Sequence, residues 1–175
     1  MLTPVHQKGM FMAQMESSNR DSVALPHNER VAAVLQRCTP NIVEDWLGRI
    51  RKSKKLSGVP LTDKELTSYL PQLIEDLTVR LRKPNTAGSE DDSPPSPAAV
   101  AHGKMRQSQG YTPGMLVHDS RILEVALFEA LNNNLGRIEF SLLLPDIMTI
   151  ADEVDSQLTQ AIDSFHNSVQ KPEAA

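Results

Sequence analysis

The sequence predicts an all-α protein, folded as a compact bundle of five to seven helices with a long C-terminal helix. Apolar residues recur every three or four positions through most of the chain, and no β-type alternation of useful length occurs. The strongest periodicity runs from Ile147 to Val169, where apolar residues are separated by 3, 1, 3, 4, 3, 1, 3 and 4 positions. Threonines placed just before a proline, or three residues before a glutamate, mark helix starts.

The first helix is expected over 28–53, with an apolar stripe on one face. It carries Trp46, the sole tryptophan, which we expect in the core. Thr39-Pro40 interrupts this segment, because threonine is a good N-cap and proline is tolerated in a first helical turn. The sequence is compatible with two abutting helices or with one kinked helix.

A capping box starts the next helix, with Thr62 at the N-cap and Glu65 three residues later. This short helix is expected to run to Tyr69. The dipeptide Leu70-Pro71 then restarts a helix that continues the apolar face.

Three further helices are expected in the second half of the chain. The first, over 97–109, ends at Gly110, the residue type that commonly follows a helix. The second, over 113–133, follows a Thr-Pro start signal and has apolar residues on most of its sides, which is typical of a central or interface helix. The third is expected over 141–169.

The surplus apolar surface of the 113–133 helix predicts a homodimer, with this helix or the last one at its seam.

The composition indicates a single domain with unstructured additions. Residues 1–27 are polar and lack periodicity, which predicts a disordered N-terminal tail. A single helical bundle domain is expected over 28–169, with a flexible acidic loop rich in serine and proline at 84–97. Either side of this loop alone offers too little apolar surface for a robust core. Residues 170–175 are expected to be a frayed tail.

The charge balance gives no indication of nucleic-acid binding. The net charge is −4 and the pI is about 5.7, whereas nucleic-acid binding usually requires a basic face and a high pI. One basic run lies where the first helix should end, and the negative end of a helix dipole favours cations there. Its members are Arg49, Arg51, Lys52, Lys54 and Lys55.

The single cysteine, Cys38, excludes an intrachain disulfide and fits a cytoplasmic protein. It has no cysteine or histidine at metal-ligand spacing, so we expect a buried thiol and no metal. No apolar run approaches the roughly 18 residues of a membrane span, and no cofactor motif occurs. We therefore expect no membrane contact and no bound cofactor.

The sequence contains no recognisable catalytic motif, so we predict that the protein is not an enzyme. Neither a nucleophile motif, nor a glycine-rich phosphate loop, nor a zinc-protease motif is present. His102 and Arg106 share one face of a predicted helix, and Gly103 between them suggests close approach of another helix or a ligand. A buried histidine bonded to a neighbouring group is the simplest interpretation. Phosphotransfer at His102 or His118, or a haem-like cofactor near His102, are alternatives.

The segment from Ala101 to Leu131 resembles a known family. Three runs carry the resemblance: His102-Gly103-x-x-Arg106, Gln109-Gly110-Tyr111-Thr112 and Leu116-Val117-x-Asp119-x-Arg121-Ile122-Leu123. Together they are similar to the N-terminal domain of RsbRD-type stress regulators, as also found before bacterial histidine kinases. The resemblance implies a cytoplasmic sensory or regulatory module in bacterial signalling and stress response. It also implies a kinase or a stress-regulator output protein as partner.

The polar residues of this segment form a candidate site across two helices. They are either a ligand-binding or regulatory pocket or a structural salt-bridge network, since buried charges must be paired. The predicted members are His102, Arg106, Tyr111, Asp119, Arg121 and Glu124.

Overall fold

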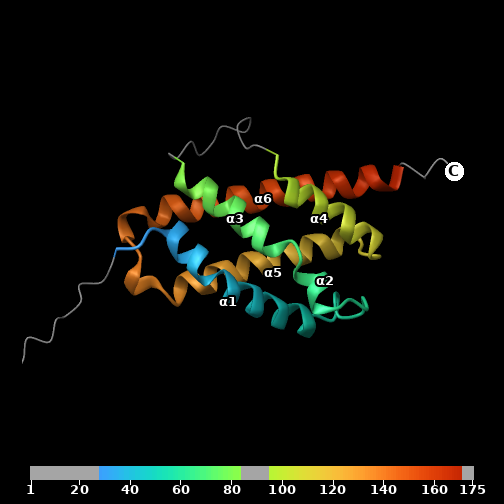
Figure 1. Cartoon of the computed structure of the whole chain (residues 1–175), viewed down its shortest axis with the longest axis horizontal. Helices are drawn as coiled ribbons and strands as arrows, with labels where there is room; N and C mark the ends of the chain where they lie inside the picture. The colour runs from blue at the N-terminus through green and yellow to red at the C-terminus, as the bar shows by residue number, and fades with distance from the viewer. Residues whose placement is uncertain (1–27, 84–94, 171–175) are drawn as a thin grey trace, which may run out of the picture.

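A computed structural model of the chain describes residues 28–83 and 95–170. Within these residues it has six α-helices, one short 3-10 helix and no strand, which confirms the predicted helical bundle with a long C-terminal helix (Figure 1). The elements are α1 (Val31–Lys52), α2 (Asp63–Thr67), α3 (Leu70–Arg82), α4 (Pro97–Ser108), α5 (Pro113–Asn132), η1 (Leu135–Arg137) and α6 (Phe140–Gln170).

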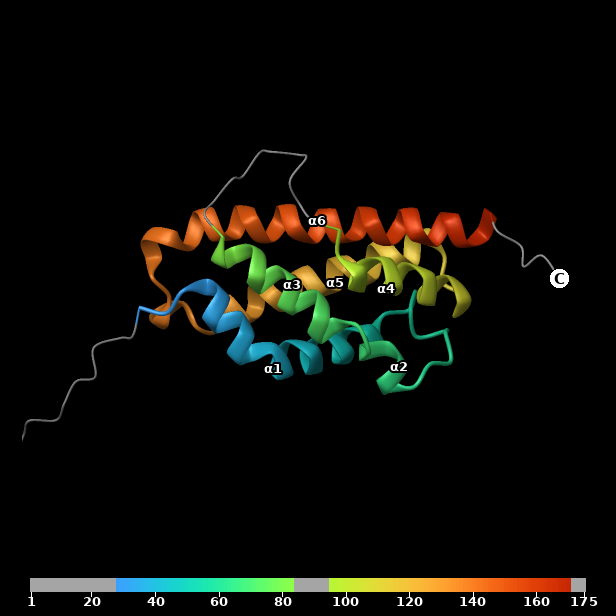
Figure 2. The same cartoon turned by 45° about the horizontal axis from the view of Figure 1, so that its top comes forward.

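The helices are arranged around the long C-terminal one. Figures 1 and 2 show α6 along one side of the molecule, with α3, α4 and α5 between it and α1. The most extensive contacts join α4 to α6, and α1 to both α5 and α3. Both halves of the sequence therefore contribute to one core, as the shortage of apolar surface on either half alone predicts.

α1 is one continuous helix through Pro40, so the interruption expected at that position does not divide it. Its start at Val31 is three residues later than expected, because the preceding backbone pairs with the segment between η1 and α6. The N–H of Glu29 donates to the Arg137 carbonyl at 2.7 Å, and its carbonyl accepts from the N–H of Glu139 at 3.0 Å. The side chains of α1 that face the core include Trp46, which is fully buried, as predicted.

The capping box that begins α2 has the predicted geometry. The N–H of Thr62 donates to Glu65 Oε2 at 2.8 Å, and the N–H of Glu65 donates to Thr62 Oγ1 at 3.3 Å. α2 ends at Thr67, and α3 begins at Leu70 with Pro71 in its first turn. Both α2 and α3 pack against α1.

Ser96 fixes the start of α4 against α3. Its hydroxyl accepts from the N–H of Ala99 at 3.1 Å and donates to Asp76 Oδ2 at 2.6 Å. Most of the predicted 84–97 loop and the predicted tail at 1–27 lie outside the described residues. So does the predicted tail at 170–175, apart from Gln170, which is the last residue of α6. No described helix is both long enough and apolar enough to cross a membrane.

Gly103 marks a close crossing of α4 and α6. A Cβ atom at this position would lie 2.0 Å from the carbonyl oxygen of Ala161 and 2.2 Å from Ser164 Oγ, both on α6. The close approach predicted for this glycine is therefore made by a helix. The absence of a side chain at Gly103 allows α4 to lie directly on α6. The side chains of α4 are thereby positioned to meet those of α5.

Candidate functional site

A buried arginine network occupies the junction of α2, α4 and α5. The guanidinium of Arg106 is 1% exposed. Its Nε donates to His102 Nε2 at 3.1 Å and to Asp119 Oδ2 at 3.2 Å. Its Nη1 donates to Gln109 Oε1 at 2.9 Å, and its Nη2 donates to the carbonyl of Leu66 at 2.8 Å. One side chain thus joins α4 to the next helix, α5, and to α2, which lies some forty residues earlier in the sequence.

The turn between α4 and α5 brings Asp119 onto Arg106. Gly110 has φ +82°, a conformation that favours glycine, and it reverses the chain after α4. The N–H of Tyr111 then donates to the Arg106 carbonyl at 3.0 Å. Thr112 caps α5 by accepting from the N–H of Met115 at 3.2 Å. The predicted glycine stop and threonine start therefore act together to position the ion pair.

Burial makes the Arg106–Asp119 pair a strong constraint on the fold. Both side chains are almost completely shielded from solvent. Each charge is tolerated only because the other neutralises it, so loss of either one leaves a buried, uncompensated charge. The backbone carbonyl of Asp119 also accepts from Trp46 Nε1 at 3.4 Å, which links the network to α1.

His102 is held as an acceptor in this network. Because Arg106 Nε carries a hydrogen, His102 Nε2 is placed to accept it through its lone pair. His102 Nε2 also lies 3.5 Å from Asp119 Oδ2, and the ring stacks on Tyr69 at a centroid distance of 5.9 Å. With an exposed fraction of only 8%, His102 has its reactive nitrogen turned away from solvent.

The ring of Tyr111 packs against the Arg106 guanidinium. The Arg106 guanidinium lies 4.8 Å from the centre of its ring, a cation–π contact. Its hydroxyl is buried, and no described residue forms a hydrogen bond with it. Burial raises the pKa of Tyr111 to about 12, the opposing effect of Arg106 being smaller. Tyr111 therefore stays neutral and serves as a platform for the cation.

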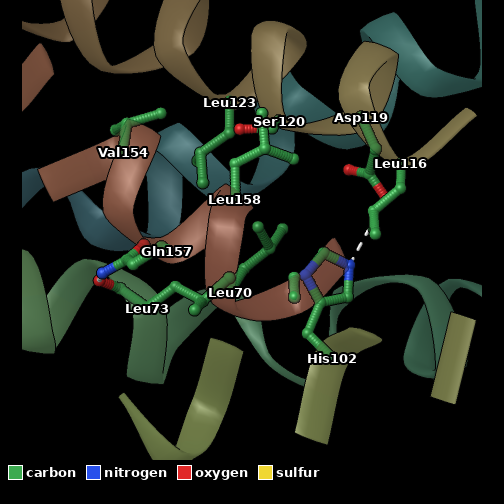
Figure 3. A pocket seen from close by; sticks show the side chains of 11 residues that line it. Leu70, Leu73, His102, Leu116, Asp119, Ser120, Leu123, Val154, Gln157 and Leu158 are labelled. Carbon is green, nitrogen blue, oxygen red and sulfur yellow. Dashed lines mark hydrogen bonds and ion pairs between the residues drawn. The ribbon is translucent and has the colours of Figure 1, made fainter. Parts of the chain in front are cut away.

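A small cavity adjoins the network on its α3 and α6 side. Figure 3 shows His102 and Asp119 at one end of this pocket, with Gln157 and Leu73 at the other. Gln157 Nε2 donates to the Leu73 carbonyl at 3.1 Å and to Glu153 Oε1 at 3.0 Å. The cavity volume is about 20 Å³, enough for roughly one water molecule.

The structure brings together four of the six predicted site residues and separates two. His102, Arg106, Tyr111 and Asp119 meet as described. Arg121 does not join them: it is exposed on another face of α5, where it lines a separate groove. Glu124 is half-buried, and no hydrogen bond or ion pair joins it to the network. The prediction was wrong for these two because residues two or five positions from Asp119 project from other sides of the helix.

Three members of the site were missed. Gln109 lies three residues after Arg106 on the same helix face, and this spacing could have identified it. The Leu66 carbonyl and the Tyr69 ring come from the region of α2, and no local signal connects that region to α4.

The arrangement holds helices together through one buried ion pair and its hydrogen bonds. No group of three or more histidine, cysteine or acidic side chains that could hold a metal occurs in the described ranges. No protein-family model, curated protein or solved structure matches the chain.

Proposed function

We propose that the protein is a non-catalytic input module of a bacterial signalling pathway, located in the cytoplasm, that acts by binding and by rearranging its helices. Its partner would be a kinase or a stress-regulator output protein. The family resemblance supports this proposal, and the arginine network gives it a physical basis.

The main supporting observation is that three polar residues of the resemblance, His102, Arg106 and Asp119, meet in one buried network. His102 and Asp119 both contact Arg106, and Gly103, on the same helix, packs on α6. A network that joins α2, α4 and α5 has few intermediate arrangements, since each buried charge must remain paired. Packed elements with discrete arrangements are the usual means of transmitting a binding event.

A gene deletion in the source bacterium tests the proposed role. We expect the deletion strain to show a several-fold change in transcripts that respond to environmental stress, restored by the wild-type gene. Unchanged transcripts under heat, salt and energy stress would contradict a regulatory role. Measuring protein levels in the complemented strain separates lost function from poor expression.

Phosphotransfer is the second candidate, and it is favoured at His118 only. His118 Nε2 lies 3.0 Å from Ser53 Oγ, and its ring lines an open groove with several cations, whereas His102 is enclosed by Arg106. Incubation with purified kinases of the same bacterium should give acid-labile phosphate that His118→Gln abolishes and His102→Gln leaves unchanged. Absence of label with every kinase rules out this candidate.

A cofactor-carrying function receives no support from the cavity beside His102. Its volume of about 20 Å³ is far below the several hundred cubic ångströms that a cofactor-sized ligand requires.

We further propose a homodimer, with its seam on α6. On α5, Ile122 and Phe128 are partly buried against the core, so that helix has less free apolar surface than its sequence predicts. At the start of α6, by contrast, Phe140, Leu144 and Met148 are 82%, 67% and 57% exposed at successive four-residue steps. Such a stripe is typical of an interface.

Paired charge variants distinguish the two helices. Phe140→Asp with Leu144→Asp should convert the dimer to a monomer in sedimentation at tens of micromolar protein. Val117→Asp with Val125→Asp, at the exposed apolar positions of α5, should leave the dimer intact. A wild-type monomer at this concentration, or dissociation by the α5 pair alone, would reject the α6 seam.

A further inference from the structure

A cationic groove lies between the end of α1 and the outer face of α5, away from the arginine network. Its volume is about 470 Å³, within the range of ligand pockets, but it is shallow and largely open to solvent. The lining residues come from the last turn of α1, the turn that follows it and three turns of α5: Arg49, Lys52, Ser53, Lys54, Lys55, His118, Arg121, Ile122 and Val125.

Most of the positive charge in this groove is not neutralised. Arg49 is paired with Asp45 at 2.7 Å and with Glu129 at 2.6 Å. The other four cations form no ion pair with any residue of 28–83 or 95–170; they are Lys52, Lys54, Lys55 and Arg121. In a chain with a net charge of −4, this is a local concentration of unpaired charge of the opposite sign.

The helix dipole accounts for only part of this arrangement. It favours cations in the last turn of α1, where Lys52 lies, and its effect falls off within that turn. Lys54 and Lys55 lie beyond the helix, and Arg121 lies in the middle of α5. Cations from two elements therefore face one space, which a helix-end effect does not explain.

The groove also has an apolar wall and a fixed polar pair. Ile122 and Val125 form the apolar wall on α5, and Val125 remains 40% exposed. His118 and Ser53 join the two sides through their hydrogen bond at 3.0 Å. The groove therefore combines a charged rim, a hydrogen-bonded link and an apolar surface, as small-molecule sites commonly do.

We propose that this groove binds a small organic phosphate with at least two negative charges. Lysine ammonium groups bind phosphate as point charges, and the planar guanidinium of Arg121 can donate two parallel hydrogen bonds to it. The organic part of the ligand lies on Ile122 and Val125. The proposal does not rest on the signalling role or on the arginine network, since the groove is a separate surface.

The test uses ATP without magnesium, pyrophosphate and adenosine as probes of the purified full chain, in calorimetric titrations at low salt. ATP should bind most tightly, pyrophosphate more weakly and adenosine least. Lys54→Gln with Arg121→Gln should weaken ATP binding at least tenfold. Lys104→Gln with Arg137→Gln removes the same two residue types at exposed sites elsewhere and should change it less than twofold.

Each contrary result overturns the proposal. The first is that ATP fails to saturate the protein at about 5 mM. The second is that the two double variants bind ATP with equal affinity. The third is that the wild type binds ATP and pyrophosphate with equal affinity. Tighter binding of a short single-stranded DNA than of ATP would identify a nucleic-acid surface instead. Because the substituted side chains are exposed, both variants should melt at the wild-type temperature.

Discussion

Replacing Gly103 by alanine tests the close crossing of α4 and α6. The added Cβ would lie 2.0 Å from the Ala161 carbonyl oxygen, a backbone atom that cannot rotate away. α4 and α6 must therefore separate, which strains the hydrogen bond from Ser164 Oγ to the Val100 carbonyl at 2.9 Å. Overpacking costs about 1–3 kcal/mol, and we take the upper end because the clash involves backbone.

Alanine also favours helix over glycine by up to about 1 kcal/mol, which offsets part of this cost. The net loss for Gly103→Ala is about 2 kcal/mol, or a fall in Tm of about 7 °C for a domain of this size. Gly48→Ala in α1 is the matched control, since no atom lies within 4 Å of the position of its Cβ. It should gain about 1 kcal/mol, a rise of about 3 °C.

Thermal unfolding followed by circular dichroism, with urea unfolding as a second measure, separates the two variants. Both substitutions add one methyl group, yet Tm should fall for Gly103→Ala and rise for Gly48→Ala. A Gly103→Ala protein at least as stable as the wild type would refute the close crossing of α4 and α6.

Three further predictions concern buried polar groups. Asp119→Asn should lower the free energy of unfolding by roughly 3 kcal/mol because it strands the Arg106 cation, whereas Asp45→Asn, at an exposed pair, should cost less than about 1 kcal/mol in urea titrations. Tyr111→Phe removes a buried hydroxyl without a hydrogen-bond partner, so Tm should stay the same or rise; a fall of several degrees would reveal a partner. Burial raises the pKa of Glu153 despite its hydrogen bond, so the folded state holds a proton that the unfolded state loses. Stability should therefore fall as pH rises from the ordinary glutamate pKa through the raised one, and Glu153→Gln should be more stable than the wild type at pH 7 but not at pH 3. Equal pH profiles for the two proteins would contradict this shift.

Local signals in the sequence were sufficient for most helix boundaries. The Thr62–Glu65 capping box, the Gly110 stop and the Thr112 start each depend on neighbours within a few residues, and each occurs as predicted. Whether Pro40 divides α1 into two helices could not be decided from such local signals. A helix can tolerate the hydrogen bond lost at a proline when the apolar face around it is buried, and burial depends on tertiary packing.

The candidate site was only partly predictable, for a reason that lies in α5. Where a helix is apolar on most of its sides, its sequence does not define which face meets the core. Asp119, Arg121 and Glu124 were therefore equally plausible members of the site, although residues two or five positions apart do not share a helix face. The contribution of the Leu66 carbonyl depends on how α2 packs, which no pattern near Arg106 encodes.

The contact between Trp46 and Asp119 allows tryptophan fluorescence to detect changes where α1 meets α5. Trp46 is the sole tryptophan, is fully buried, and donates from its indole to the backbone carbonyl of Asp119. Its fluorescence therefore comes from one position, where α1 meets the residue that neutralises Arg106. A change in emission without loss of helical signal would register motion of α5 against α1 with no added label, and would time that motion on mixing with any candidate ligand.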